Sequence, residues 1–259
     1  MEQKLHTPEG VRDIYNKECE TKLTLQRKLN KVLHLYGYQD IQTPTFEYYE
    51  VFRKEIGSTS TQELYKFFDR EGNILALRPD ITPSVARAAA TLFEAEDMPI
   101  RLCYAGNTFI NHSSYQGRLK ENTQLGAELI GLDSVEADAE MLAMVVDSLK
   151  QVGLEEFQVS LGHVDFIRSL LKAAGLEEDE NREIRALITN RNFFGVEEIL
   201  DAHQVKESIR EAFRLLPELT GGPEVLELAM GAAPDLDAKL AVTRLQQIFR
   251  LLKLYGADD

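Results

Sequence analysis

The sequence predicts an α+β fold over residues 1–163, followed by a helical domain over residues 164–259. In the first part, strand-like and helical segments follow one another without the strict strand–helix–strand repeat of a parallel sheet. An antiparallel sheet with helices packed against it fits this order better. From residue 164 to residue 255, apolar side chains recur at helical spacing, interrupted only by glycine and proline.

The first helix is expected over residues 17–36, where apolar side chains recur on one helix face. Gly37 ends this pattern. A short strand is expected over residues 38–43 and ends at Pro44, because proline cannot donate to a strand ladder. The apolar positions of the helix are Leu25, Leu29, Val32, Leu33 and Tyr36.

A β-hairpin is predicted next. Strand-like residues 65–68 and 74–77 flank the turn-forming residues 69–73, DREGN. An alanine-rich helix then follows over residues 83–93, with Asp80 or Thr82 available to cap it.

Two further strands are predicted over residues 99–105 and 124–131. The residues DSVE that begin at Asp133 resemble a capping box, and the helix behind them ends at Gly153. Alternating side chains predict one more strand over residues 157–162, ahead of the helical domain.

Composition narrows the classes of function. The chain of 259 residues carries a formal charge of −14, and such a field disfavours a general nucleic-acid-binding role. No apolar run approaches the ~20 residues that a membrane span needs, and the first residues do not resemble a signal peptide. Cys19 and Cys103 fit no metal-binding spacing, so we expect two reduced thiols, no metal and a cytoplasmic location.

Short catalytic motifs are absent from the sequence. It contains no Walker loop, no GxGxxG after a strand, no HExxH and no GxSxG. We therefore expect no cofactor.

Three segments together resemble class II aminoacyl-tRNA synthetases, and histidyl-tRNA synthetases in particular. The first helix with the strand ending at Pro44 is similar to the first signature motif, which forms the dimer interface in that family. Residues 77–83, LRPDITP, are similar to the segment LRPE-x-T, with aspartate in place of glutamate. Residues 117–118 and 124–128, GR and QLGAE, resemble the end of the second signature motif. The resemblance implies a class II synthetase-like antiparallel sheet with a helical insertion module.

The second motif departs from the family where chemistry is carried out. The family pattern reads phenylalanine, arginine, any residue, glutamate, whereas this chain reads FINH over residues 109–112. Ile110 therefore stands at the position of the arginine that grips the α-phosphate and the amino-acid carboxylate, and His112 replaces the glutamate. Loss of one such group commonly costs ~10²–10³ in rate. The chain also ends at Asp259, before the third motif is expected, so a shortened form of a longer protein stays open.

A chain that keeps the amino-acid-binding motifs of a synthetase but lacks its catalytic arginine resembles the regulatory subunits of ATP phosphoribosyltransferase. The resemblance implies a non-catalytic protein that assembles with the short catalytic subunit, is required for its activity and takes part in histidine feedback at the first step of histidine biosynthesis. It also implies a homodimer within a hetero-oligomer, with the first helix in the two-fold interface. The alternatives are a divergent or fragmentary histidyl-tRNA synthetase core and a similar core adapted to another amino acid.

The resemblance places four residues around L-histidine, namely Asp80, Thr82, Gln124 and Glu128. Helix capping is the alternative role for Asp80 and Thr82. A carboxylate in an apolar strand needs a partner, so Glu128 is expected to face either an imidazole nitrogen or an unseen arginine or lysine. Arg118 is a possible phosphate contact, with a solvated loop position as the alternative.

Overall fold

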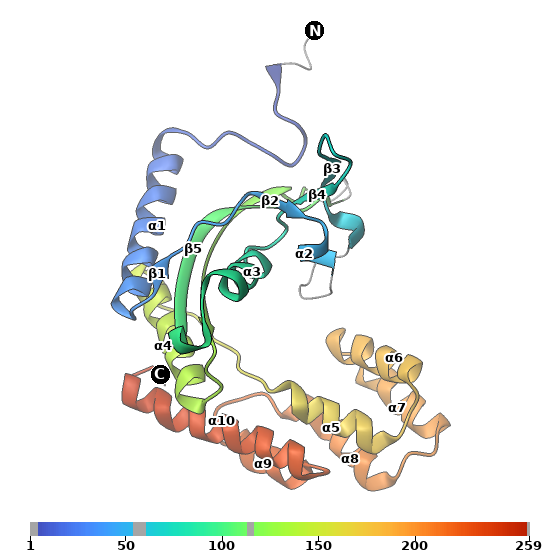
Figure 1. Cartoon of the computed structure of the whole chain (residues 1–259). Coiled ribbons are helices and arrows are strands. Elements are labelled where there is room, and N and C mark those ends of the chain that lie inside the picture. Colours follow the sequence, from blue (N-terminus) through green and yellow to red (C-terminus); the bar gives the residue numbers. More distant parts are fainter. Residues whose placement is uncertain (1–4, 54–60, 113–116, 258–259) are drawn as a thin grey trace. The chain divides into compact units, whose positions relative to one another are not determined.

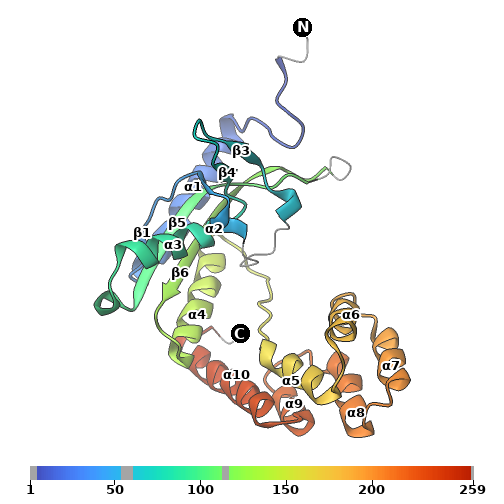
Figure 2. The ribbon, with the colours of Figure 1, turned by 45° about the vertical axis from the view of Figure 1, so that its right-hand side comes forward.

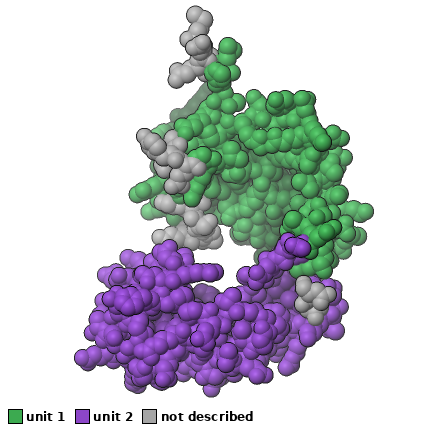
Figure 3. Space-filling model, turned by 180° about the vertical axis from the view of Figure 1, so that it is seen from behind, with its two compact units in different colours: residues 1–133, 144–155 green, residues 134–143, 156–259 purple. Residues whose placement is uncertain are grey.

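A computed structural model describes residues 5–53, 61–112 and 117–257. The chain divides into two compact units, coloured separately in Figure 3. Unit 1 comprises residues 1–133 and 144–155, and unit 2 comprises residues 134–143 and 156–259. The predicted boundary at residue 163 stays a prediction.

Unit 1 is built on two small sheets. In the larger one, β5 (Ile100–Phe109) lies between β1 (Gln39–Asp40) and β6 (Glu121–Ile130). β5 and β6 are antiparallel along their whole length, whereas β1 runs parallel to β5. The second sheet is antiparallel, with β4 (Ile74–Leu77) between β2 (Phe46–Tyr48) and β3 (Lys66–Phe68). The predicted α+β architecture is confirmed, with two sheets in place of one and with β1 parallel to β5.

Helices cover both faces of the larger sheet (Figures 1 and 2). The long α1 (Asn16–Leu35) lies along one face. On the other face, α3 (Thr82–Leu92) buries Val85 and Ala89 against Leu102 and Tyr104 of β5. Two short elements, α2 (Glu50–Arg53) and the 3₁₀ turn Thr61–Glu63, accompany the second sheet. A second 3₁₀ turn, Ala95–Asp97, leads into β5.

Most predicted elements of this region are present. The hairpin turn is closed by Asp69, whose carboxylate accepts hydrogen bonds from the backbone and side chain of Asn73. α4 (Val135–Gln151) begins as predicted, since Ser134 accepts from the amide of Ala137. The strand predicted over residues 157–162 is wrong, because this segment pairs with no strand in the described part of the chain.

Unit 2 is helical, as the sequence predicts. Its side chains pack around a core of fully buried residues, among them Leu170, Ile184, Leu200, Phe213 and Val242. None of its helices, nor any other in the described residues, has the length and apolar character of a membrane span. The helices are α5 (Val164–Ala174), α6 (Glu178–Thr189), α7 (Phe193–Ala202), α8 (Glu207–Leu215), the 3₁₀ turn Leu216–Glu218, α9 (Val225–Ala232) and α10 (Leu236–Tyr255).

Candidate functional site

The candidate histidine site lies on the face of the larger sheet that α3 covers. On a strand, alternate residues share a face, so Gln124, Gly126 and Glu128 of β6 point to the same side. Their cross-strand partners on β5 are Gly106, Tyr104 and Leu102. The turn between β4 and α3 brings Asp80 and Thr82 to this face, where both contact β6 side chains.

Asp80 and Gln124 form the first pair. The Gln124 amide donates to Oδ1 of Asp80 at 2.8 Å, and its carbonyl oxygen accepts from the backbone amide of Ile81 at 3.1 Å. Asp80 also accepts from the amide of Thr82 at 3.2 Å. Ile81 occupies the N-cap and makes no side-chain capping hydrogen bond, so neither Asp80 nor Thr82 is the N-cap residue that the sequence predicted. Asp80 instead ties the start of α3 to β6.

Glu128 is held by two hydroxyl groups. Thr82 donates to its Oε1 at 2.7 Å and Tyr104 donates to the same atom at 3.0 Å. Within the described residues, no arginine or lysine pairs with Glu128, and its hydrogen bonds all fall on Oε1. The second carboxylate oxygen is therefore available to accept from a ligand.

Tyr104 belongs to this cluster, and the sequence reasoning missed it. Its side chain is buried, and burial together with the nearby Glu128 carboxylate raises the pKa of its hydroxyl well above the usual range. The phenol is therefore a permanent donor at neutral pH. The glycine of the QLGAE segment leaves room for this side chain, because a Cβ on Gly126 would lie 2.5 Å from the Tyr104 hydroxyl.

A pocket of about 450 Å³ adjoins Thr82 and Glu128. Its other walls are mostly apolar and come from α3, the segment before β5, and β6: Ala86, Ala89, Ala90, Phe93, Glu94, Ala95, Met98 and Ile130. An apolar chamber with a carboxylate at its edge can hold a small flat ring and accept one hydrogen bond from it.

The site is acidic. Asp80 and Glu128 are both half-buried, and no cation of the described chain pairs with either carboxylate. Arg78 lies nearby in sequence but is committed elsewhere, because its guanidinium donates to the carbonyl oxygens of Thr43 and Asn107. Burial lowers its pKa from the ordinary value. The arrangement therefore suits a positively charged ammonium group better than an anion.

Ile110 and Arg118 lie outside the cluster. Ile110 follows the last residue of β5, and its amide donates to the carbonyl of Lys120 at 2.9 Å; its side chain has no polar atom. Arg118 is exposed, beside a small hollow of about 170 Å³ that Glu9 and Gly10 also line. The side chain of His112 is 20% exposed, and its Nδ1 lies 3.2 Å from Oε1 of Glu63.

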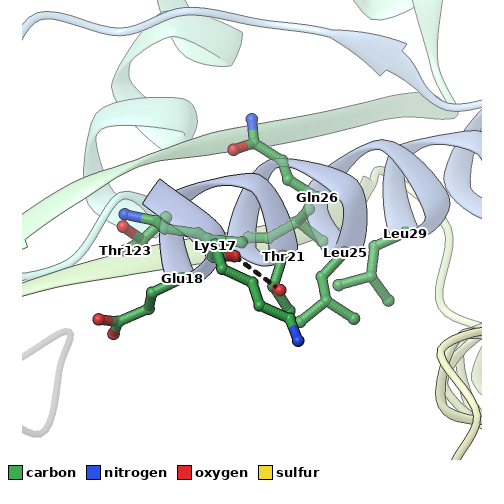
Figure 4. Close-up of a pocket in the computed structure, with 9 residues that line it drawn as sticks. Lys17, Glu18, Thr21, Leu25, Gln26, Leu29 and Thr123 are labelled. Atoms are coloured by element: carbon green, nitrogen blue, oxygen red, sulfur yellow. Dashed lines mark hydrogen bonds between the residues drawn. The ribbon is translucent and has the colours of Figure 1, made fainter. Parts of the chain in front are cut away.

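A groove of about 610 Å³ runs along α1 on the opposite face of the sheet (Figure 4). Thr123 and Leu125, which alternate with the site residues of β6, form part of its wall. Leu25 and Leu29 point into the groove from the helix, and Leu25 is 39% exposed. The apolar stripe predicted for this helix is therefore buried only at its end, at Val32 and Leu33.

The chain resembles known proteins over nearly its whole length. A model of the family described as histidyl-tRNA synthetase matches residues 10–258. The ATP phosphoribosyltransferase regulatory subunit of Acetivibrio thermocellus is 38% identical over 255 residues, which cover 98% of this chain and 61% of the relative. That of Desulforamulus reducens is 39% identical over 250 residues, covering 96% of this chain and 62% of the relative.

Solved structures of related proteins share the fold of this chain. The crystal structure of an ATP phosphoribosyltransferase regulatory subunit/histidyl-tRNA synthetase from Bacillus halodurans superposes with a TM-score of 0.89 at 32% identity, covering 98% of this chain and 66% of that one. Histidyl-tRNA synthetase from Nostoc shares the fold, with a TM-score of 0.78 at 18% identity over 97% of this chain and 58% of that one. The chain thus spans about three fifths of the length of the first curated relatives that it matches. It belongs to the histidyl-tRNA synthetase family, together with the ATP phosphoribosyltransferase regulatory subunits that it resembles.

Proposed function

We propose that this protein is a non-catalytic regulatory subunit of ATP phosphoribosyltransferase. In this role it assembles in the cytoplasm with the short catalytic subunit, activates it and mediates feedback by L-histidine at the first step of histidine biosynthesis. The names of its relatives support the assignment. The observation that carries it is twofold. The candidate amino-acid-binding residues contact one another, and Ile110 stands where a synthetase has its catalytic arginine.

The ammonium group and the imidazole ring of histidine each have a partner of suitable chemistry, whereas the carboxylate has none. The ammonium group is placed by Asp80 and Gln124, which already form a hydrogen-bonded pair. The imidazole ring fits the apolar pocket, with one ring nitrogen donating to the second oxygen of Glu128. The carboxylate is left without a cation, because Ile110 supplies no donor.

Because the histidine carboxylate lacks a cationic partner, we expect histidine to bind weakly. A hydrogen bond to a charged group contributes roughly 1.5–3 kcal/mol, which corresponds to ~10- to 150-fold in affinity. Such a site releases histidine when its concentration falls, as a feedback sensor must.

The test is calorimetry with L-histidine on the complex of this protein with its catalytic subunit. We expect Glu128→Ala to abolish the histidine-dependent heat and the feedback inhibition. Equal binding to wild type and Glu128→Ala would show that this pocket is not the sensor, and feedback would then act through another site, such as one on the phosphoribosyltransferase subunit. Thr243→Ala on α10, in unit 2, is the matched control and should bind as wild type does.

The main rival is a divergent histidyl-tRNA synthetase. Histidine-dependent pyrophosphate exchange by the purified protein would establish that activity, and we expect none. A site adapted to another amino acid is a second rival, and a thermal-shift panel of the twenty amino acids separates it from a histidine sensor.

We also propose that two copies of the chain pair through α1. Leu25, Leu29 and Leu125 give the groove along α1 an apolar wall, and Leu25 is 39% exposed. A second copy related by a two-fold axis would bury both copies of this stripe at once.

A further inference from the structure

Three potential metal ligands meet where α1 passes into β1. Nε2 of His34 lies 3.0 Å from Oδ2 of Asp40, and Sγ of Cys103 lies 3.6 Å from Oδ1 of the same carboxylate. One ligand atom from each residue lies within 4.8 Å of the other two. This group lies apart from the proposed histidine site, and no role has been given to it above.

The backbone fixes the three residues in place. His34 is in the last turn of α1, and Gly37, at φ 85°, turns the chain into β1. Asp40 on β1 is paired in register with Cys103 on β5, and the amide of the next residue, Ile41, donates to the Cys103 carbonyl at 2.9 Å. The sequence predicts no metal site because Cys19 and Cys103 fit no metal-binding spacing. Asp40 and Cys103 are 63 residues apart and meet only through strand pairing.

The spacing suits a tetrahedral ion. Zinc bonds of about 2.3 Å to sulfur and about 2.0–2.1 Å to nitrogen and oxygen imply ligand separations of roughly 3.3–3.6 Å. The separations of 3.0 Å from His34 Nε2 to Asp40 Oδ2 and 3.6 Å from Cys103 Sγ to Asp40 Oδ1 lie within a few tenths of an ångström of this range. Because they end on different carboxylate oxygens, Asp40 would turn to present one oxygen to the ion. Small side-chain rotations of the half-exposed His34 and Asp40 would complete the geometry.

We propose that His34, Asp40 and Cys103 bind one zinc-class divalent cation, with solvent as the fourth ligand. A thiolate, an imidazole and a carboxylate form a donor set for zinc and its transition-metal neighbours, whereas Mg²⁺ and Ca²⁺ prefer oxygen alone. The side chains of His34 and Asp40 are 46% and 61% exposed, so an ion can enter from solvent and retain a water.

A reactive thiol is the competing role for Cys103, and its surroundings oppose it. Burial and the adjacent Asp40 carboxylate raise the pKa of the Cys103 thiol to about 11. At neutral pH the thiol is therefore protonated and a poor nucleophile. Binding of the cation would release this proton to solvent as the sulfur–metal bond forms. A cation among the three residues neutralises the same carboxylate.

The test is a metal titration of the full-length, chelator-stripped protein with Zn²⁺, in competition with a chromophoric chelator. Co²⁺ as a spectroscopic substitute should give a thiolate-to-metal charge-transfer band. We expect one high-affinity ion per chain. Loss of a residue that merely supports a ligand costs about 10–100-fold in affinity, so His34→Gln, Asp40→Asn and Cys103→Ser should each cost at least about 100-fold.

The other cysteine supplies the matched control, since Cys19→Ser should bind Zn²⁺ as wild type does. His34→Gln and Asp40→Asn change exposed side chains and keep the test valid if Cys103→Ser fails to fold, which circular dichroism will show. The proposal is overturned if His34→Gln and Asp40→Asn retain wild-type affinity, if Cys19→Ser removes the site, or if Co²⁺ binds without the charge-transfer band.

Discussion

Tyr104 donates a hydrogen bond of 3.0 Å to Glu128, although neither residue is the cross-strand partner of the other. Tyr104 is paired with Gly126, and Glu128 with Leu102. The tyrosine side chain therefore occupies the space over Gly126 to reach the carboxylate. The glycine is a structural requirement of the candidate site, because a Cβ there would lie 2.5 Å from the hydroxyl and 2.6 Å from the ring carbon that bears it.

Gly126→Ala should therefore damage both stability and ligand binding. The buried Tyr104 ring has to move, and such overpacking typically costs about 1–3 kcal/mol. Urea unfolding measures the loss of stability, and calorimetry measures the expected loss of histidine affinity. Gly162→Ala is the matched control, because a Cβ at Gly162 meets nothing within 4 Å. Equal stability of the two variants would show that Tyr104 is not confined as described.

The raised pKa of Tyr104 predicts a component of stability that is lost in alkali. Burial raises this pKa above the ordinary value of 10.0, so the unfolded chain releases the phenolic proton first. The contribution is fully present below pH 10 and declines as the pH rises above it. Tyr104→Phe lacks this component, so its unfolding free energy should fall less steeply above pH 10 than that of wild type. Denaturant unfolding across this range checks it, with the exposed Tyr15→Phe as control. Parallel curves for Tyr104→Phe and wild type would refute the argument.

Local patterns predicted much of this fold because they reflect local physics. The hairpin could be predicted because Asp69 and Asn73 close the turn themselves. The strand predicted over residues 157–162 failed because alternation describes a strand's faces and says nothing of whether a partner strand is present.

The residues of the candidate site also fall into those that the sequence predicts and those that it does not. Asp80, Thr82, Gln124 and Glu128 could be named from motif order, and the structure brings them together. Tyr104 could not, because its role depends on the register of β5 against β6. The group formed by His34, Asp40 and Cys103 could not be predicted either, because its members meet only through the pairing of β1 with β5.

Ile110→Arg tests the proposed loss of the carboxylate partner. If the arginine reaches the ligand carboxylate, histidine affinity should rise by ~10- to 150-fold, the equivalent of one charged hydrogen bond. Pyrophosphate exchange should stay absent, because His112 still replaces the glutamate of the same motif. Calorimetry and an exchange assay give the two readings, with Ile110→Leu as the control that adds no charge. An unchanged affinity would mean that position 110 does not face the ligand.

Leu170→Ala should destabilise unit 2 strongly. Leu170 is fully buried in the core of this unit, and such a truncation typically costs about 2–5 kcal/mol. Leu240→Ala is the matched control, because Leu240 is 57% exposed and its loss should cost little. Chemical denaturation compares the two. Similar losses would mean that Leu170 does not lie at the centre of the helical core.

Leu25→Asp should disrupt the proposed homodimer. Leu25 points into the groove along α1, and a two-fold axis through this helix brings both copies of the residue into one apolar contact. Burying two unpaired carboxylates there is strongly unfavourable, whereas in a monomer the 39% exposed side chain tolerates the charge. Light scattering at micromolar concentration should therefore show a wild-type dimer and a folded, monomeric variant. The control is Leu254→Asp, because Leu254 is 82% exposed and lies on α10. A monomeric wild type, or a dimer that survives Leu25→Asp, would remove α1 as the interface.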